Sequence, residues 1–183
     1  MGATAGDVYS MYSSSRWRRH FLRHPTLGAY DAAARQLDAA FGLPAGLLER
    51  VKRQESGGMF LVPNSSAGAI GIMQLMPGTA RALGVNPRDP LQATYGAAEY
   101  LSSLARRYHG NMQEALAAYN WGPGHVDKLL SRYGSGWRGH LPKGVNSYVT
   151  ATAPDPHISV TVRAKTGASA VLAGAGLAAV PGT

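Results

Sequence analysis

Apolar residues in the middle of the chain recur at three- and four-residue spacing, a pattern that predicts a series of short helices. Residues 29–41 carry the first apolar stripe, which consists of Ala33, Leu37 and Phe41. Residues 43–55 carry the second, with Pro44 expected in the first turn and a stripe of Leu47, Leu48 and Val51. Further helices are expected over residues 76–84, 89–110, 111–120, 125–134 and 143–151.

Helix-capping and helix-breaking residues mark the ends of several of these segments. Pro77 stands where a helix can begin, and Gly84 stands where it is expected to stop. Asp89 is expected to cap the longest helix, which would end at Gly110, and Asn111 is expected to cap the next one. The segment 28–153 is therefore predicted to fold as one mainly α-helical domain.

The two ends of the chain differ from this helical part. Residues 1–27 contain four Arg and one Asp, which predicts a basic N-terminal arm. After Pro154, the residues Ile158, Val160 and Val162 alternate with polar neighbours, as they do in a β-strand. A short β-rich tail is therefore expected over residues 154–183.

Composition limits the classes of protein to which the chain can belong. Its 183 residues, 45% of them apolar, suffice for one sizeable core. The absence of cysteine excludes a disulfide framework and thiolate chemistry. The N-terminus lacks the apolar segment of a Sec signal peptide, and no run reaches the ~18 apolar residues of a membrane span. We expect neither a Sec signal peptide nor a transmembrane segment.

The net charge of +8 is concentrated at the two ends of the chain. Residues 1–27 contribute four Arg against one Asp, and residues 133–183 contribute four Lys or Arg against one Asp. A basic surface favours polyanions such as nucleic acid, phospholipid head groups or anionic wall polymers, without choosing among them. A nucleic-acid binder is thus an alternative that rests on charge alone, and no specific nucleic-acid partner is expected.

Glu55 is the only acid in residues 53–77, where an apolar helix gives way to a polar, glycine-rich loop. Cleavage of a glycosidic bond requires protonation of the leaving oxygen, which a carboxylic acid can supply if burial raises its pKa from ~4.3 to ~6. Met73, Leu75 and Met76 offer apolar packing nearby. The alternative, which the pattern alone favours, is a solvated glutamate at a helix end.

A second carboxylate, which most glycosidases use as nucleophile or base, is not evident in the sequence. Asp89 is explained as a helix cap, and Glu99 and Glu114 are expected on helix surfaces. If the chain cleaves a glycan, one acid must therefore perform both proton transfers while the substrate supplies the nucleophile.

Four motifs carry a resemblance to a known family: "ES" at 55–56, "SSAGAIGIMQLMP" at 65–77, "ALAAYNWGPGHV" at 115–126 and "SYV" at 147–149. In this order and spacing they resemble the soluble lytic transglycosylases, from about Leu43 to Thr150. The resemblance implies a mainly α, lysozyme-like fold of the goose-lysozyme type. It also implies cleavage of the β-1,4 bond between N-acetylmuramic acid and N-acetylglucosamine in peptidoglycan, with 1,6-anhydro ends formed without water.

The same resemblance assigns roles to individual residues. Glu55 would be the single acid and then the base, with Tyr119 hydrogen-bonded to it and Tyr148 closing the far wall of the groove. The other groove residues would be Ser65, Gln74, Met76 and Asn120. No cofactor is expected, and no metal site, because His20 and His24 have no acidic ligand beside them. Ordinary core packing remains the alternative for the tyrosines and for Met76.

Departures from the family pattern and two rival enzymatic or structural functions remain open at this stage. Ala93 stands where the family usually has Asn, and Trp121 stands where a small residue is common. The rivals are a goose-type lysozyme that hydrolyses the same bond with water, and a non-catalytic wall-binding or virion structural subunit. Peptidoglycan glycan strands are the expected partner.

The ends of the chain suggest a location. The C-terminal segment weakly resembles strand-rich tails of bacteriophage virion proteins, and exposed strands invite pairing with another chain. We therefore expect a virion-associated protein that acts in the bacterial periplasm or cell wall. Its basic arm and its tail are expected to contact other virion proteins.

Overall fold

The computed structural model describes residues 27–59 and 64–153, together with positions 4, 6–8, 10 and 14. In this part of the chain the regular elements are helices, and the nearest approach to a β-structure is a single bridge between Ile70 and Leu75. The basic arm predicted over 1–27 lies almost entirely outside the described residues, and the β-rich tail predicted over 154–183 lies wholly outside them.

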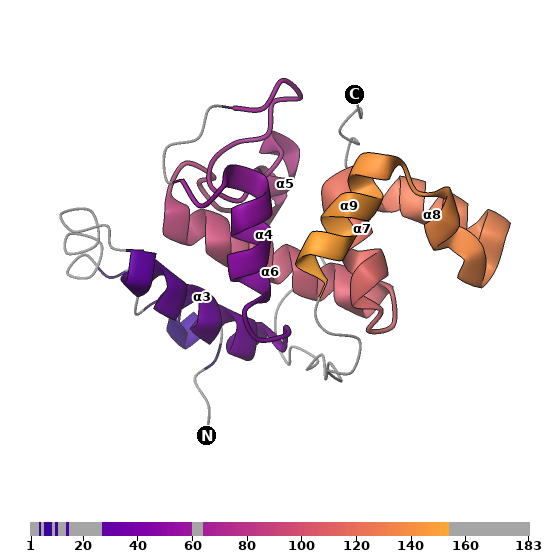
Figure 1. Cartoon of the computed structure of the whole chain (residues 1–183). Helices are drawn as coiled ribbons and strands as arrows, with labels where there is room; N and C mark the ends of the chain where they lie inside the picture. Colours follow the sequence, from indigo (N-terminus) through magenta and orange to yellow (C-terminus); the bar gives the residue numbers. More distant parts are fainter. Residues whose placement is uncertain are drawn as a thin grey trace.

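The described helices follow one another with short connections, except between α4 and α5, which residues 57–76 separate (Figure 1). They are α3 Leu27–Phe41, α4 Leu47–Ser56, α5 Pro77–Leu83, α6 Pro90–Arg107, α7 Met112–Trp121, α8 Pro123–Tyr133, the 3-10 helix η1 Gly134–His140 and α9 Lys143–Thr152. The mainly α-helical architecture predicted from the sequence is therefore confirmed.

Several predicted helix ends are found where the capping residues place them. The Asp89 side chain accepts hydrogen bonds from the first backbone amides of α6, and the Asn111 side chain does the same for α7. Pro77 begins α5, and Gly84 ends it in the left-handed conformation. These short polar and conformationally special residues act locally, which is why the sequence predicts them well.

Other boundaries differ from the prediction. Helix α4 begins at Leu47 rather than at Pro44, because Gly46 adopts a left-handed conformation with φ 72° immediately before it. Helix α6 ends at Arg107, three residues before Gly110, and η1 was not predicted at all. A run of glycines and polar residues gives no apolar period from which a 3-10 helix can be recognised.

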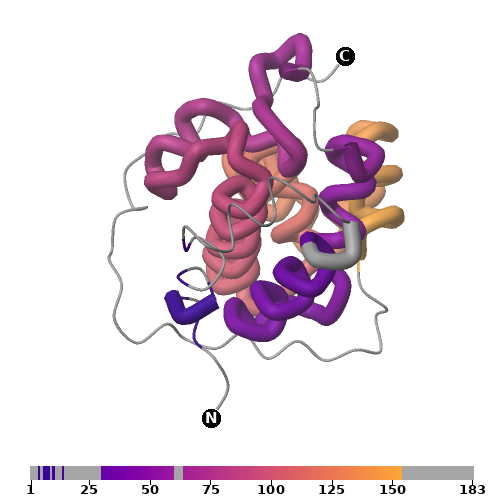
Figure 2. Tube along the Cα trace, turned by 90° about the vertical axis from the view of Figure 1, so that its left-hand side faces the viewer, coloured from indigo at the N-terminus to yellow at the C-terminus, as the bar shows by residue number. Residues whose placement is uncertain are grey.

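Helix α6 runs through the middle of the domain and packs against α3, α4, α5 and α7 (Figures 1 and 2). Its close contact with the segment after α5 depends on Gly96, where a Cβ atom would lie 2.8 Å from a methyl group of Val85. Helices α4 and α9 lie side by side, as both views show. The α4–α9 contact joins two segments far apart in the sequence.

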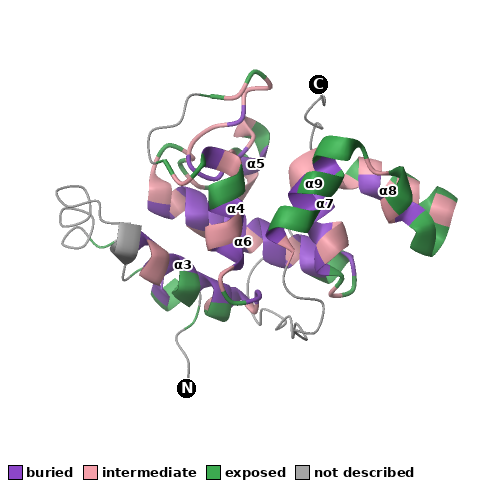
Figure 3. Ribbon diagram, viewed as in Figure 1, coloured by how far each residue is buried: buried purple, intermediate pink, exposed green. Residues whose placement is uncertain are grey.

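The apolar core lies between these helices, and the outer face of α8 and η1 is the most exposed part (Figure 3). Ala93, which departs from the family pattern, is fully buried in α6, as are Ala97 and Ala98. Small side chains allow neighbouring helices to approach α6 closely. No helix in the described part of the chain is both long and apolar enough to span a bilayer.

Candidate active site

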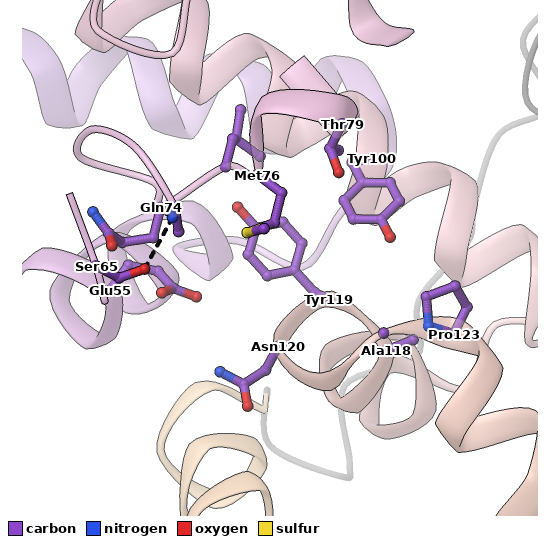
Figure 4. A pocket seen from close by; sticks show the side chains of 13 residues that line it. Glu55, Ser65, Gln74, Met76, Thr79, Tyr100, Ala118, Tyr119, Asn120 and Pro123 are labelled. Carbon is purple, nitrogen blue, oxygen red and sulfur yellow. Dashed lines mark hydrogen bonds between the residues drawn. The ribbon is translucent and has the colours of Figure 1, made fainter. Parts of the chain in front are cut away.

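A pocket of about 150 Å³ opens between the end of α4, the 65–76 loop, α5 and the α7–α8 corner. Six of the seven predicted site residues line it: Glu55, Ser65, Gln74, Met76, Tyr119 and Asn120 (Figure 4). The seventh, Tyr148, reaches Glu55 from α9. The structure thus brings all seven predicted residues to one place, although they come from four separate stretches of the sequence.

Glu55 lies in the last turn of α4, where Gly57 ends the helix with φ 61°. The Tyr148 hydroxyl donates a hydrogen bond of 2.7 Å to Glu55 Oε1. Burial raises the pKa of Glu55 to about 7, and the hydrogen bond from Tyr148 lowers it in part. Glu55 can therefore hold a proton near neutral pH and can also release it, as an acid and then a base require.

The predicted hydrogen bond between Tyr119 and Glu55 is wrong. The Tyr119 hydroxyl instead donates to the backbone oxygen of Met73 at 2.9 Å, and Tyr148 takes the place next to the acid. Tyr119 still lines the pocket, and its ring packs against Tyr100 with a centroid separation of 5.6 Å. The motif alone does not indicate which of two nearby phenols reaches the carboxyl group.

The loop between Ser65 and Met76 folds into two successive tight turns. The Ser65 hydroxyl accepts a hydrogen bond from the amide of Ala69, drawn as a dashed line in Figure 4. At the second turn, paired backbone hydrogen bonds join Ile70 to Leu75. Together with the bond from Tyr119 to Met73, these contacts fix the loop at the edge of the pocket.

Gln74 has an unusual backbone conformation, with φ 46° in a residue other than glycine. Its side-chain amide donates to the backbone oxygen of Gly71 at 2.7 Å. Gly71 is required on two counts: its φ is 75°, and a Cβ atom there would lie 1.9 Å from the backbone oxygen of Pro87. Backbone strain of this kind is concentrated at functional sites, where the surrounding structure holds it.

The placement of α4 depends on polar contacts at its other end. Buried Asp38 in α3 accepts a hydrogen bond from the Leu48 amide, and burial raises the pKa of Asp38 to about 7. The Arg50 guanidinium donates to the backbone oxygen of Thr152 at 3.0 Å, which ties α4 to α9. Helix α4 carries Glu55 and helix α9 carries Tyr148, so this contact supports their alignment.

Sequence reasoning missed several pocket residues, among them Thr79, Tyr100 and Pro123. Thr79 and Tyr100 carry no motif of their own, since each reads as an ordinary helix residue in the sequence. Pro123 belongs to the motif at 115–126, but the resemblance assigned it no role in the groove. Glu55 is the only acid among the residues that line the pocket.

These features define a lysozyme-like helical domain with one partly buried acid in a pocket. A solved structure supports this fold: an inactive mutant of the lytic transglycosylase Slt from Pseudomonas aeruginosa superposes with a TM-score of 0.59 and 24% identity. The superposition covers 82% of this chain and 29% of that one.

The profile of the family described as "Transglycosylase SLT domain" matches residues 32–138, more than half of the chain. The chain belongs to the transglycosylase SLT domain family, as the four motifs predicted. The match excludes α9, which supplies Tyr148.

Relatives of known name that match this chain include several transglycosylases. A transglycosylase of Enterobacteria phage PRD1 is 41% identical over 107 residues, which cover 51% of this chain and 40% of the relative. The membrane-bound lytic murein transglycosylase F of Cellvibrio japonicus is 40% identical over 105 residues, which cover 54% of this chain and 21% of the relative. The membrane-bound lytic murein transglycosylase F of Pseudomonas fluorescens (strain Pf0-1) is 41% identical over 144 residues, which cover 73% of this chain and 27% of the relative. The matches thus span well under half the length of these relatives.

Proposed function

We propose that this protein is a lytic transglycosylase that cleaves the β-1,4 bond between N-acetylmuramic acid and N-acetylglucosamine in peptidoglycan. The proposal rests on the environment of Glu55, the single acid that lines the pocket. Its pKa is raised to about 7, and its carboxyl group accepts a hydrogen bond from Tyr148. The names of the relatives, which include lytic murein transglycosylases and a phage transglycosylase, agree with this activity.

In the first step of the proposed reaction, protonated Glu55 gives its proton to the leaving oxygen of N-acetylglucosamine as the C1–O4 bond breaks. The acetamide oxygen of the muramyl sugar bonds to C1 and stabilises the positive charge there. In the second step, the Glu55 carboxylate removes the proton of the C6 hydroxyl, and O6 displaces the acetamide oxygen from C1. The products are a 1,6-anhydromuramyl end and a free hydroxyl on N-acetylglucosamine, with Glu55 protonated again.

The absence of a second acid from the pocket lining favours this reaction over a two-carboxylate mechanism. The goose-type hydrolase differs only in the attacking group, which would be water. Its product would be a reducing end instead of an anhydro end.

Product analysis tests the proposal. Purified sacculi are digested with the protein, and the soluble fragments are analysed by mass spectrometry, where each anhydro end is lighter than a reducing end by one water. We expect anhydromuramyl ends from the parent protein. Reducing ends alone would identify the hydrolase, and intact sacculi would indicate a non-catalytic subunit.

The variant Glu55→Gln tests the assigned acid, because an amide cannot supply the proton while its shape still fits beside Tyr148. We expect at least a ~1,000-fold loss of cleavage rate, measured as release of soluble fragments. Glu114→Gln is the matched control, since Glu114 lies on α7 outside the pocket and its side chain accepts a hydrogen bond from nearby Asn111. It should digest sacculi at the parental rate. Equal activity of Glu55→Gln and the control would contradict the role of Glu55.

We further propose that the enzyme opens the cell wall as part of a phage particle. The relative from phage PRD1 supports this setting, as does the weak resemblance of residues 154–183 to virion proteins. The test is mass spectrometry of purified particles from the source phage. Peptides of this chain at a constant ratio to the capsid protein are expected, and their absence from particles that retain lytic activity would contradict the proposal.

A further inference from the structure

The side chain of Arg138 in η1 connects helix α7 to helix α9. Its Nη1 atom donates a hydrogen bond of 2.7 Å to Gln113 Oε1, in the first turn of α7. Its Nε and Nη2 atoms donate to Asn146 Oδ1 at 3.3 Å and to Thr150 Oγ1 at 3.1 Å, both in α9. One guanidinium group therefore joins three elements of the domain.

The two acceptors in α9 lie on either side of Tyr148 in the sequence. Asn146 and Thr150 are four positions apart, so they share one face of the helix, and both are exposed. Tyr148 is two positions from each, which turns it by about 200° to the opposite face, where it is 4% exposed. Arg138 thus holds the outer face of the turn whose inner face presents the phenol to Glu55.

The contact depends on the shape of the guanidinium group as well as on its charge. A guanidinium presents its donors in a rigid plane, whereas a lysine ammonium group is a compact charge at the end of a flexible chain. Three acceptors on two helices therefore suit arginine better than lysine. The backbone that carries Arg138 is also anchored, because its neighbour Trp137 is 5% exposed and belongs to the apolar core.

Helix α9 packs against α7 and also against α4, the helix that carries Glu55 (Figure 1). The bond from Tyr148 to Glu55 crosses the contact between α9 and α4, so its length of 2.7 Å depends on where α9 lies. A rotation or slide of α9 that lengthens this bond beyond about 3.2 Å would weaken or break it. The three bonds of Arg138 resist such a displacement, because they fix α9 to the start of α7.

We infer that Arg138 is a positioning residue, which keeps the hydroxyl group of Tyr148 within hydrogen-bond distance of Glu55. It acts through α9 and does not line the pocket itself. The inference rests on the proposed function, because the position of Tyr148 affects the reaction only if Glu55 is the acid. It extends the candidate active site to a residue of η1, an element that the sequence did not predict.

The titration of Glu55 provides a readout that needs no turnover. The Tyr148 hydrogen bond lowers the pKa of Glu55 against the effect of burial, so a weaker bond should raise that pKa above about 7. Burial raises the pKa of both Tyr119 and Tyr148, so these neighbouring phenols stay neutral during the titration. No charged side chain other than Glu55 lines the pocket.

Carbon-13 NMR of the side-chain carboxyl groups measures this pKa directly. The chain contains four glutamates, and the signal of Glu55 is the one that disappears in Glu55→Gln. In Arg138→Lys, which keeps the charge but loses the planar fork, the pKa of Glu55 should rise by at least about a third of the rise in Tyr148→Phe. At pH 6, kcat/KM for sacculi should fall about three- to tenfold, because the acid is less well oriented.

Arg132→Lys is the matched control. Arg132 lies in the last turn of α8, is exposed, and places its guanidinium over the Tyr133 ring at 5.3 Å. This substitution should change neither the pKa of Glu55 nor the rate. Thr150→Val is the independent second variant, because it removes one acceptor of Arg138 in α9 while keeping the shape of the side chain. It should raise the pKa of Glu55 as well, and it decides by the same criterion if Arg138→Lys does not fold.

A double variant separates positioning from a general effect on the fold. In the Tyr148→Phe background, Arg138→Lys should not move the pKa of Glu55 further, because no hydroxyl is left to position. An equal rise with and without that hydroxyl would overturn the inference. So would an unchanged pKa of Glu55 in folded Arg138→Lys, even with a lower melting temperature, since that result would leave Arg138 a structural role alone.

These outcomes are distinguishable from a failure of the proposed function. The pKa of Glu55 is measured in the folded protein without substrate, so it does not depend on the products formed from sacculi. A parent protein that leaves sacculi intact would contradict the proposed function, whereas the pKa values of the four proteins would still show whether Arg138 positions Tyr148.

Discussion

Two opposing influences act on the carboxyl group of Glu55. Burial disfavours the charged form and raises its pKa, while the hydrogen bond from Tyr148 favours the charged form and lowers it. The balance leaves the pKa at about 7, near the value at which one group can serve as acid and as base. A fully solvated glutamate would be ionised at neutral pH and could not provide the proton for the first step.

The dependence of activity on pH follows from this pKa. The first step needs protonated Glu55, so kcat/KM should be constant at low pH and fall about tenfold per pH unit above about 7. Release of soluble fragments from labelled sacculi, measured between pH 5 and 9, checks this expectation. If kcat/KM instead begins to fall near pH 4.5, the pKa of an exposed glutamate, burial does not control the pKa of Glu55. The falling part of the pH profile is its descending limb.

Tyr148→Phe separates the two influences. Loss of the phenolic donor removes the interaction that lowers the pKa of Glu55, so the descending limb should move to higher pH. At pH values below the descending limb, kcat/KM should be about tenfold lower than in the parent, because the carboxyl group loses one charge-assisted hydrogen bond that orients it. Tyr119→Phe provides the contrast: its hydroxyl bonds to the Met73 backbone, so the limb should stay in place. If the descending limb moved equally in both variants, the hydrogen bond from Tyr148 to Glu55 would not be what lowers the pKa.

At the scale of elements, the turn between Ile70 and Leu75 shapes the pocket edge. The sequence motif predicts that Gln74 and Met76 line the pocket, and glycine-rich spacing predicts a turn. Only the structure shows why position 71 requires glycine. The backbone of Pro87, 16 positions further along the chain, leaves no room there for a side chain. Contacts between distant segments have no signature in a local pattern.

Gly71→Ala should therefore destabilise the protein by about 2–4 kcal/mol, from a backbone clash and a disfavoured positive φ. Gly78→Ala is the matched control: Gly78 lies in α5, and a Cβ atom there meets nothing within 4 Å. It should be neutral or stabilising by up to ~1 kcal/mol. Urea unfolding followed by circular dichroism measures both variants, and similar midpoints for the two would refute the packing argument.

The elements that sequence reasoning predicted are those with local signals. Asp89 and Asn111 cap their helices because a short polar side chain bonds to amides two or three positions away. The start of α4 was misplaced because Gly46, rather than Pro44, sets the turn before it. The exchange of roles between Tyr119 and Tyr148 has a different, non-local origin, since the choice of partner depends on how α7 and α9 dock.

At the scale of the whole molecule, the raised pKa of Glu55 couples folding to pH. An unfolded glutamate has a pKa of about 4.5, and Glu55 in the folded protein has a pKa of about 7. Between these values the folded state binds more protons than the unfolded state, so the free energy of unfolding falls as pH rises. The stability associated with protonated Glu55 is fully present below pH 4.5 and is lost as pH passes 7.

Glu55→Gln removes this coupling, because an amide does not ionise. The variant should become more stable relative to the parent as pH rises from 5 to 8, by about 1–3 kcal/mol at the upper end. Buried Asp38, whose pKa is also raised, is present in both proteins and cancels in the comparison. Thermal melts of the pair at several pH values measure the difference. A difference that does not vary with pH would mean that Glu55 titrates as an exposed group.

The Tyr148 phenol that bonds to Glu55 comes from the last helix described, 93 positions downstream of Glu55. A ribosome therefore exposes the glutamate well before it releases α9, and the nascent chain carries an acid without its partner. Proteolysis that removes the segment from Ser147 onward would likewise leave Glu55 without its Tyr148 partner. Under the proposed function, the parental rate therefore requires that synthesis has passed α9, and copies that end earlier should lack the contribution of the Tyr148 hydroxyl.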